Sequence, residues 1–492
     1  MSDSNTETPS RIGWQWEHTY ASLPPAFFSS VDPEAVLSPS LVALNDELAG
    51  ALGLSPDVLT ATNGVAALSG STVPDGAKPI AQAYAGHQFG NFTMLGDGRA
   101  ILLGEHVTPD GRRVDIQLKG SGRTPYSRGG DGKAALGPML REYIIAEAMH
   151  GLGIPTTRSL AVVATGQPVY RETELPGAVL TRIASSHLRV GTFEFASRFA
   201  GPDAVRALAD YAIARHFPEV RAAEHPYRAL WQAVAERQAG LVAQWMGVGF
   251  VHGVMNTDNV SIAGETIDYG PCAFIEAYEP ATVFSSIDQF GRYAYGQQPA
   301  IARWNLARFA ETLISLFDEI PDRALAWAQE AVDGLEATMQ SAWLAVMGRK
   351  LGLERAETSD ETLVNDWLAW MRRHHLDFTN TFRAFGESPQ RFMDGLAGEP
   401  AAEFREWHER WSKRISDPSA ARKIMQEANP VYIPRNHRVE AALIAAAEHG
   451  DLSPFHRLTA VLRRPFDKQP EHADCRDPAP LSDPPYRTFC GT

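Results

Sequence analysis

The stretch VHGVMNTDNVSIAGETIDYG, residues 251–270, constrains the fold more than any other part of the chain. The segments on either side of it, 227–246 and 304–317, repeat apolar residues at the spacing of an α-helix. Inside the stretch, apolar and polar residues alternate instead, which is typical of short strands. Aspartates and asparagines stand between these short pieces. The stretch therefore predicts a polar, partly β-like region that interrupts a helical domain.

The spacing of its polar residues matches a protein-kinase catalytic loop, which reads H-R-D-x-x-x-x-N and is followed by D-F-G. His252 and Asn259 keep the same offset, and Asp268-Tyr269-Gly270 stands in place of D-F-G. Asn and Asp are the oxygen ligands that hold Mg²⁺ against nucleotide phosphates. Val254, at the H-R-D aspartate position, cannot accept a proton, but Asp258 offers another carboxylate. Alone, Asp-Tyr-Gly is an ordinary turn; the combination favours a metal and nucleotide site.

The N-terminal half supplies a different pattern. Strand-like runs at 91–96, 99–107 and 112–120 are separated by Gly-rich turns, and a helical pattern follows at 138–150. Two more strand-like runs, LAVVATG and GAVLTRIA, come next. Strands, one helix and further strands predict a small α+β lobe that ends near residue 183.

Lys119 ends one of these strands. In VDIQLKG, apolar and polar residues alternate, so the lysine shares a face with the polar residues. It could be a solvated edge residue, but a kinase-like strand lysine reaches the phosphates and pairs with a glutamate of the next helix. The helix offers Glu142 and Glu147, and periodicity does not choose between them.

Two glycine-rich turns and two arginines complete the candidates. Gly96-Asp97-Gly98-Arg99 and Gly129–Gly132 would let backbone N–H groups approach a phosphate, although such turns are also common in hairpins. Arg182 and Arg189 follow a strand and would either clamp a polyphosphate or be solvated. The order of these features along one chain, rather than any one of them, indicates a nucleotide site.

The expected fold class is therefore α+β, a protein-kinase-like two-lobed fold with a β-rich N-lobe and a mainly helical C-lobe. The expected segments are an N-terminal extension packing on the lobes (1–80), the N-lobe (81–183), the helical C-lobe with the catalytic and metal-binding loops (184–464) and an extended C-terminal tail (465–492).

Composition limits the classes of partner that this chain is expected to bind. A formal net charge of −14 argues against nucleic acid, whose phosphate backbone requires clustered Lys and Arg. No apolar run reaches membrane-spanning length, and the N-terminus MSDSNTETPS lacks a signal-peptide pattern, so we expect a cytoplasmic protein that does not bind membranes. Three cysteines, Cys272, Cys475 and Cys490, are too few for a disulfide framework and lack zinc-ligand spacing.

Taken together, the motifs resemble the selenoprotein O family of kinase-like proteins. The matching segments lie at 81–105, 117–137, 147–163, 252–271 and 429–443. The resemblance implies a kinase-like fold and protein AMPylation, in which AMP passes from ATP to a Ser, Thr or Tyr hydroxyl of a protein. It also implies an ATP molecule that lies reversed relative to kinases and presents its α-phosphate.

The resemblance assigns roles by matching motif. Asp258 would be the proton acceptor, Asn259 and Asp268 would bind Mg²⁺ or Mn²⁺, and Lys119 would bind phosphate and pair with Glu142. The other nucleotide-binding residues that it implies are Gly96, Gly98, Arg99, Asp131, Gly132, Arg182 and Arg189, together with Asp268.

Two other functions remain open at this point. The chain could transfer UMP from UTP with Mn²⁺, or it could be a non-catalytic nucleotide-binding scaffold, as Val254 suggests. The cysteines are candidate redox residues. Cys272 follows the metal-binding motif, and a disulfide to Cys475 would hold the tail over the cleft; Cys490 stands where some members of the family carry selenocysteine.

Overall fold

An antiparallel β-sheet organises the N-terminal part of the molecule. The computed structural model describes residues 12–480 and 486–488. Within those residues nine strands form the sheet, in the order β2-β4-β7-β8-β11-β10-β3, with β1 paired to β7 and β9 paired to β11. The strands are β1 (Trp16–Glu17), β2 (Phe28–Ser30), β3 (Ser40–Leu44), β4 (Ile80–Gln82), β7 (Ala100–Val107), β8 (Arg113–Lys119), β9 (Ala134–Ala135), β10 (Arg158–Tyr170) and β11 (Glu174–Ala184).

The two faces of this sheet differ in chemistry because side chains alternate along each strand. On β8, Val114, Ile116 and Leu118 join a small apolar core. The short helices α1 (Asp46–Ala51), α2 (Pro56–Thr60) and α3 (Thr62–Leu68) contribute to this core. Asp115, Gln117 and Lys119 lie on the opposite face and are also buried. A row of buried polar groups needs partners, and the rest of the fold supplies them.

Helix α4 (Leu136–Gly151) lies beside this polar face. It packs against β10 and β11, and against α15 (Asn436–His449) and α16 (Ser453–Leu462) on its other side. It begins two residues before the predicted helix and is buried over most of its length. The helix therefore joins the sheet to the C-terminal part of the chain.

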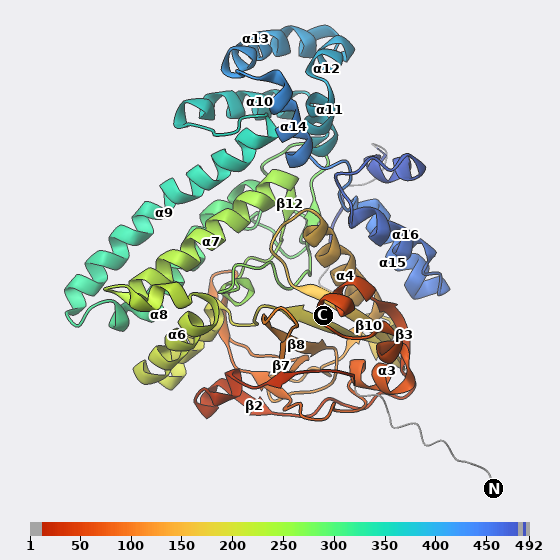
Figure 1. Ribbon diagram of the computed structural model, residues 1–492, viewed down its shortest axis with the longest axis vertical. Coiled ribbons are helices and arrows are strands. Elements are labelled where there is room, and N and C mark those ends of the chain that lie inside the picture. Colours follow the sequence, from red (N-terminus) through yellow and green to blue (C-terminus); the bar gives the residue numbers. More distant parts are fainter. Residues whose placement is uncertain (1–11, 481–485, 489–492) are drawn as a thin grey trace.

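The remaining chain is mainly helical. In Figure 1, α6 to α9 lie to one side of the sheet, α10 to α14 stand at the top, and α15 and α16 lie on the other side. The helices are α5 (Val190–Phe195), α6 (Pro202–His216), α7 (Pro226–Val248), α8 (Gln298–Phe317), α9 (Pro321–Lys350), α10 (Glu361–Arg373), α11 (Phe378–Glu387), α12 (Pro389–Gly395), α13 (Gly398–Arg414) and α14 (Pro418–Ala428).

The loop region predicted at 251–270 begins where α7 ends. Gly249 closes the helix in the left-handed conformation, at φ 75°, which glycine adopts without strain. Two short paired strands, β12 (Phe250–Val251) and β13 (Ala273–Phe274), bracket the loop. A 3₁₀ turn at Thr257–Asn259 lies inside it. The prediction of short β pieces within a helical domain is therefore confirmed.

Several details differ from the sequence-based expectation. The run at 91–96 does not join the main sheet; it forms a separate hairpin of β5 (Ala85–Gln88) and β6 (Asn91–Met94). The expected boundary at 80/81 falls inside β4, and residues before it supply strands β1 to β3. The tail is not wholly extended, since Pro470–Arg476 forms a 3₁₀ segment. Short strands at a sheet edge carry too little pattern to be recognised alone.

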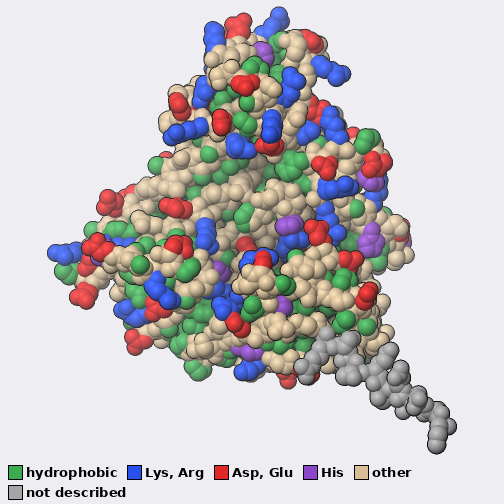
Figure 2. Space-filling view, viewed as in Figure 1, with side chains coloured by type: hydrophobic (Ala, Val, Ile, Leu, Met, Phe, Trp, Pro, Cys, Tyr) green, Lys and Arg blue, Asp and Glu red, His purple; other side chains and the backbone are tan. Residues whose placement is uncertain are grey.

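The described part of the chain contains no helix that is long and apolar enough to cross a membrane. On the face shown in Figure 2, acidic and basic side chains are interspersed rather than separated into large regions of one sign.

Candidate functional site

A pocket of about 1000 Å³ lies between the sheet, α4 and the loop that follows β12. Its walls come from segments far apart in the sequence: the turn at 96–99, the end of β8, the glycine-rich loop at 128–133, and residues 254–271. Every nucleotide-binding or metal-binding residue predicted above lines it. These are Gly96, Gly98, Arg99, Lys119, Asp131, Gly132, Glu142, Arg182, Arg189, Asp258, Asn259 and Asp268.

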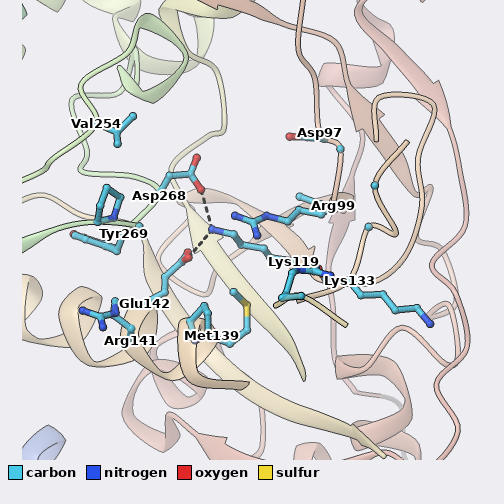
Figure 3. A pocket seen from close by; sticks show the side chains of 18 of the residues that line it. Asp97, Arg99, Lys119, Lys133, Met139, Arg141, Glu142, Val254, Asp268 and Tyr269 are labelled. Carbon is cyan, nitrogen blue, oxygen red and sulfur yellow. Dashed lines mark hydrogen bonds and ion pairs between the residues drawn. The ribbon is translucent and has the colours of Figure 1, made fainter. Parts of the chain in front are cut away.

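Five of these side chains form one buried ionic cluster. Lys119 Nζ lies 2.6 Å from Glu142 Oε2 and 3.0 Å from Asp268 Oδ1, as Figure 3 shows. Arg182 donates to Glu142 Oε1 at 2.7 Å and to Asp268 Oδ1 at 2.6 Å. Arg189 Nη1 reaches Asp268 Oδ2 at 3.2 Å. Three cations facing two carboxylates leave one net positive charge, which an anionic ligand can balance.

The cluster holds its carboxylates ionised. Burial alone would raise the pKa of Asp268, but Arg182, Lys119 and Arg189 outweigh it and hold that pKa well below its ordinary value. Burial, followed by the charge of Arg182, lowers the pKa of Lys119. Asp268 also has a positive φ of 61°, which is uncommon for a residue with a side chain. Such conformations concentrate at functional sites.

Glu142, and not Glu147, is the partner of Lys119. Glu147 is bound by Arg158 instead, whose Nε lies 2.7 Å from Glu147 Oε1. Both glutamates are buried on α4, but they point to different neighbours. The ion pair implied by the family resemblance is therefore the one that the structure contains.

Asp258 lies in the 3₁₀ turn and is 7% exposed. Its Oδ1 has no hydrogen-bond partner among the described residues. Burial, partly opposed by Arg189, raises the pKa of Asp258 to about 7. A carboxyl group with that pKa, and with one oxygen that has no hydrogen-bond partner, is suited to accept a proton near neutral pH.

Neighbouring backbone packs closely against Asp258. A Cβ added to Gly86, on β5, would overlap the Asp258 side chain, and a Cβ added to Gly191, on α5, would overlap the carbonyl oxygen of Ala85. Arg189 Nη1 also donates to the Asp258 carbonyl oxygen at 2.9 Å. Asp258 is thus held by the hairpin, α5 and the ionic cluster together.

Asn259 and Asp268 are oxygen donors on the wall of the same pocket. Asn259 uses its Nδ2 to donate to the Val254 carbonyl oxygen at 2.9 Å, which leaves its amide oxygen available. Within the described residues no group of three or more His, Cys, Asp or Glu side chains is arranged to hold a metal ion. Mg²⁺ commonly takes one or two protein oxygens and completes its shell with phosphates and water. The donor set therefore fits an ion that binds together with a nucleotide.

His252 plays a structural part. Its ring Nε2 lies 3.0 Å from the Ile267 carbonyl oxygen, and its backbone N–H donates to Gln298 Oε1 at 3.0 Å. Burial lowers its pKa. The histidine thereby ties the residue before Asp268 to the start of the loop.

The two glycine-rich turns lie at the other side of the pocket. Gly96 and Gly132 have positive φ values of 124° and 68°, so a side chain at either position would strain the turn. Arg99 extends toward Lys119 and Asp268, whereas Lys133 points away (Figure 3). Asp131 is bound by Arg171, whose Nη1 lies 2.9 Å from Asp131 Oδ2.

Two further buried acidic residues, Asp97 and Glu194, could not be recognised as candidates from the sequence. Asp97 was visible only as a turn residue, yet burial raises its pKa to about 6 and its carboxylate accepts from the Gln82 N–H at 3.1 Å. Glu194, with a pKa that burial raises to about 7, bonds to His87 Nδ1 at 2.5 Å and accepts from the Thr257 hydroxyl. Their partners are distant in sequence, so no local pattern announces them.

The candidate redox residues are only partly described. Cys272 and Cys475 are both buried, and no disulfide joins them. Burial raises the pKa of Cys475. Cys490 lies outside the described residues. A disulfide between Cys272 and Cys475 under oxidising conditions stays a prediction.

Comparison with known proteins identifies the family. A family model described as protein adenylyltransferase SelO matches residues 10–463. "Protein nucleotidyltransferase YdiU" of Geobacillus kaustophilus is 58% identical over 486 residues, which cover 98% of this chain and 99% of that protein. Proteins of the same name from Halalkalibacterium halodurans and Alkaliphilus metalliredigens are 57% and 55% identical, over 99% and 98% of this chain and the same shares of their own lengths. The resemblance found in the motifs is confirmed, and the chain belongs to the SelO family of protein adenylyltransferases.

Proposed function

We propose that this protein transfers AMP from ATP to Ser, Thr or Tyr hydroxyls of other proteins and releases pyrophosphate. Membership of the family makes the chain a nucleotidyltransferase. The observation that carries the finer proposal is the position of Asp258. Its buried carboxylate has one oxygen without a hydrogen-bond partner, and it lines the same pocket as an ionic cluster with one excess positive charge.

The proposed architecture is that of a protein kinase. The proposed N-lobe at 81–183 contains α4 and most of the sheet, and the proposed N-terminal extension at 1–80 adds strands β1 to β3 to it. The helical part belongs to the proposed C-lobe at 184–464, which is followed by the tail at 465–492. The Lys119–Glu142 pair between β8 and α4 supports this assignment, because kinases pair a strand lysine with a helix glutamate in the same way.

In the proposed reaction, the acceptor hydroxyl attacks the α-phosphate of ATP. The acceptor hydroxyl oxygen forms a bond to the α-phosphorus, and the bond from that phosphorus to the oxygen bridging to the β-phosphate breaks. The hydroxyl proton passes to Asp258, and pyrophosphate leaves with the electron pair of the broken bond. Lys119, Arg182 and Arg189 would stabilise the charge that develops on the leaving group, since preorganised cations in a buried site act strongly on such charge.

Asn259 and Asp268 would hold the divalent ion, Mg²⁺ or Mn²⁺. When bound, such an ion neutralises phosphate charge and orients the phosphates. Both metals accept oxygen ligands of this kind, and UTP is the alternative nucleotide.

The test uses ATP labelled at either the α- or the γ-phosphate, with the protein itself and Ser-, Thr- and Tyr-containing peptides as acceptors. We expect label from the α position in the acceptor and none from the γ position. Replacing ATP by UTP measures the alternative UMP transfer under the same conditions. Label from neither nucleotide would favour a non-catalytic scaffold and would overturn the proposal.

Two variants locate the base. Asp258→Asn should lower AMP transfer by about 10²- to 10⁴-fold while nucleotide binding persists, because it removes the proton acceptor alone. Val254→Asp restores the H-R-D aspartate, yet it should gain no γ-phosphoryl transfer if ATP lies reversed, since a base without an in-line phosphate has nothing to assist. Label from the γ position in Val254→Asp would contradict the reversed orientation.

A further inference from the structure

Large apolar side chains are exposed beside the pocket, where a soluble protein would ordinarily place polar ones. Phe290 is 97% exposed and Ile287 is 54% exposed, and Ile287 lines the pocket itself. On the hairpin and at the end of α5, Phe92 and Phe199 are 41% and 54% exposed. Single exposed apolar residues are ordinary, but several gathered at the edge of a functional pocket indicate an interaction surface.

Ring contacts connect Phe92 and Phe199 to neighbouring aromatic side chains, and Phe290 lies two residues before Arg292 in the chain. The rings of Phe92 and Phe199 lie 6.2 Å apart, and His87 contacts both Phe92, at 5.4 Å, and Trp304, at 5.3 Å. The Arg292 guanidinium lies over Trp304 at 4.8 Å. We call Phe92, Phe199, Phe290, Arg292 and Trp304 the hairpin surface.

Arg292 brings an uncompensated charge to this surface. No carboxylate among the described residues forms an ion pair with it, and its buried Nε has no hydrogen-bond partner there. Its guanidinium lies close to the turn of the hairpin, since a Cβ added to Gly90 would be 3.9 Å away. A guanidinium packed on an indole is fixed in place and ready for a carboxylate.

The hairpin surface is fixed relative to the proposed base. The His87 N–H donates to Thr257 Oγ1 at 2.7 Å, and the Phe89 N–H donates to Asn256 Oδ1 at 3.0 Å. Glu194 bonds to both His87 and Thr257. Asp258 follows Thr257 directly, so a partner seated on the hairpin has a defined position relative to the carboxylate.

We propose that the hairpin surface docks the acceptor protein, through an extended segment that carries an aromatic or aliphatic side chain and a carboxylate near the modified hydroxyl. This inference rests on the proposed function. Asp258 is buried inside the pocket, so the acceptor residue has to reach inward from a segment free of helix. The exposed rings would then contact the apolar neighbour, and Arg292 would donate hydrogen bonds to the carboxylate of the acidic one.

The test measures AMP transfer from α-labelled ATP to a panel of synthetic peptides. Each peptide has one central hydroxyl residue, and its neighbours are varied among apolar, acidic, basic and glycine residues. We expect the wild type to prefer peptides that combine an aromatic and an acidic neighbour. Arg292→Glu should reverse the charge preference, so that the kcat/KM ratio between acidic and basic peptides falls by about tenfold or more, equivalent to the loss of one good contact.

Phe290→Ser tests the apolar part without risk to the fold, because the side chain is almost fully exposed. Its KM for the aromatic peptide should rise by about tenfold, with its KM for ATP unchanged. Arg410→Glu, which alters an exposed arginine of α13 paired with Asp366, is the matched control and should leave both preferences as in the wild type.

An unchanged charge preference in Arg292→Glu would overturn the inference. So would a change of oligomeric state in Phe290→Ser without a change in KM, because the surface would then bind a second copy of the chain. Both results leave AMP transfer intact and so leave the proposed function standing. Transfer to no acceptor at all would overturn the proposed function and the inference together.

Discussion

Lys119 and its partners lie at the polar face of the sheet, whereas a group of aromatic side chains around Trp367 lies between helices α10 to α13 at the top of the molecule (Figure 1). The Trp367 ring lies 4.8 Å from Trp407 and 5.0 Å from Phe385. Both clusters are buried, but one consists of charges and the other of rings.

This difference in chemistry indicates that stability and function depend on different parts of the molecule. Rings buried against rings contribute by removing apolar area from water. Buried ions lose their hydration, and their mutual attraction does little more than offset that loss. The aromatic cluster therefore stabilises the fold, whereas the ionic cluster around Asp268 contributes little stability and is explained by the proposed nucleotide site.

Asp268→Asn, which disrupts the ionic cluster, should have the largest effect, and that effect should be on AMP transfer. It removes the charge that holds Lys119, Arg182 and Arg189, and with it one of the two proposed metal ligands, so AMP transfer at saturating Mg²⁺ should fall by about 10³-fold or more. The fold should persist, because the Asp268 side chain is 25% exposed and Glu142 still pairs with two of the cations. Near-normal transfer of α-label would show that Asp268 is not a metal ligand.

Trp367→Ala should have the opposite effect, since it should lower stability and leave AMP transfer intact. Removal of a fully buried indole should lower the free energy of unfolding by about 3–5 kcal/mol. Specific activity of the molecules that remain folded should stay close to that of the wild type. Denaturant unfolding followed by Trp fluorescence measures the first quantity, and AMP transfer well below the melting temperature measures the second. A loss of activity without a loss of stability would refute the separation.

Lys350 sharpens the comparison, because it is an ionisable side chain within the apolar part. Its Nζ donates to Asn429 Oδ1 at 2.8 Å and lies over the Phe382 ring at 4.3 Å. Burial lowers its pKa from 10.5 to about 7. Between those values the unfolded chain binds a proton that the folded chain does not, so stability should rise with pH.

The expected slope from Lys350 is at most about 1.4 kcal/mol per pH unit between pH 7 and 10.5, with no further change below that window. Lys350→Met lacks this titration. Urea unfolding of both proteins across the window isolates the effect as a difference, in which all other groups cancel. A difference that stays constant with pH would mean that Lys350 keeps its charge in the folded state.

The smallest effect is expected at a surface ion pair. Arg410 Nη1 lies 2.7 Å from Asp366 Oδ2, and both side chains are 44% exposed. Arg410→Ala should change the free energy of unfolding by less than about 1 kcal/mol, because solvent screens such pairs. An effect as large as that of Trp367→Ala would mean that this pair is coupled to the aromatic cluster below it.

The sequence allowed much of the ionic cluster to be predicted, and physical reasons explain what it left open. Alternation along β8 placed Lys119 on the polar face, but the choice between Glu142 and Glu147 depends on how α4 lies across the sheet. Helical periodicity carries no information on that register. Arg182 was compatible with a solvated position, yet it is 2% exposed between two carboxylates.

The support of Asp258 was beyond prediction for a different reason. Glu194 joins His87 and Thr257, which are 107 and 63 residues away along the chain. Such contacts form only when the chain folds, and they produce no periodic pattern in the sequence. The kinase-like spacing indicated Asn259 and Asp268 as metal ligands and offered Asp258 as a further carboxylate, and the family resemblance then assigned Asp258 the role of proton acceptor.

The glycines beside Asp258 limit how this pocket can be transferred to another protein. Because Gly86 leaves no space for even a methyl group next to the carboxylate, a designer who copied only the charged residues would displace the proposed base. The pocket would keep its cations and its affinity for phosphate while losing the acceptor of the proton. Absent side chains are therefore part of the specification of this site, and a search for distant relatives should score Gly86 and Gly191 alongside the aspartates.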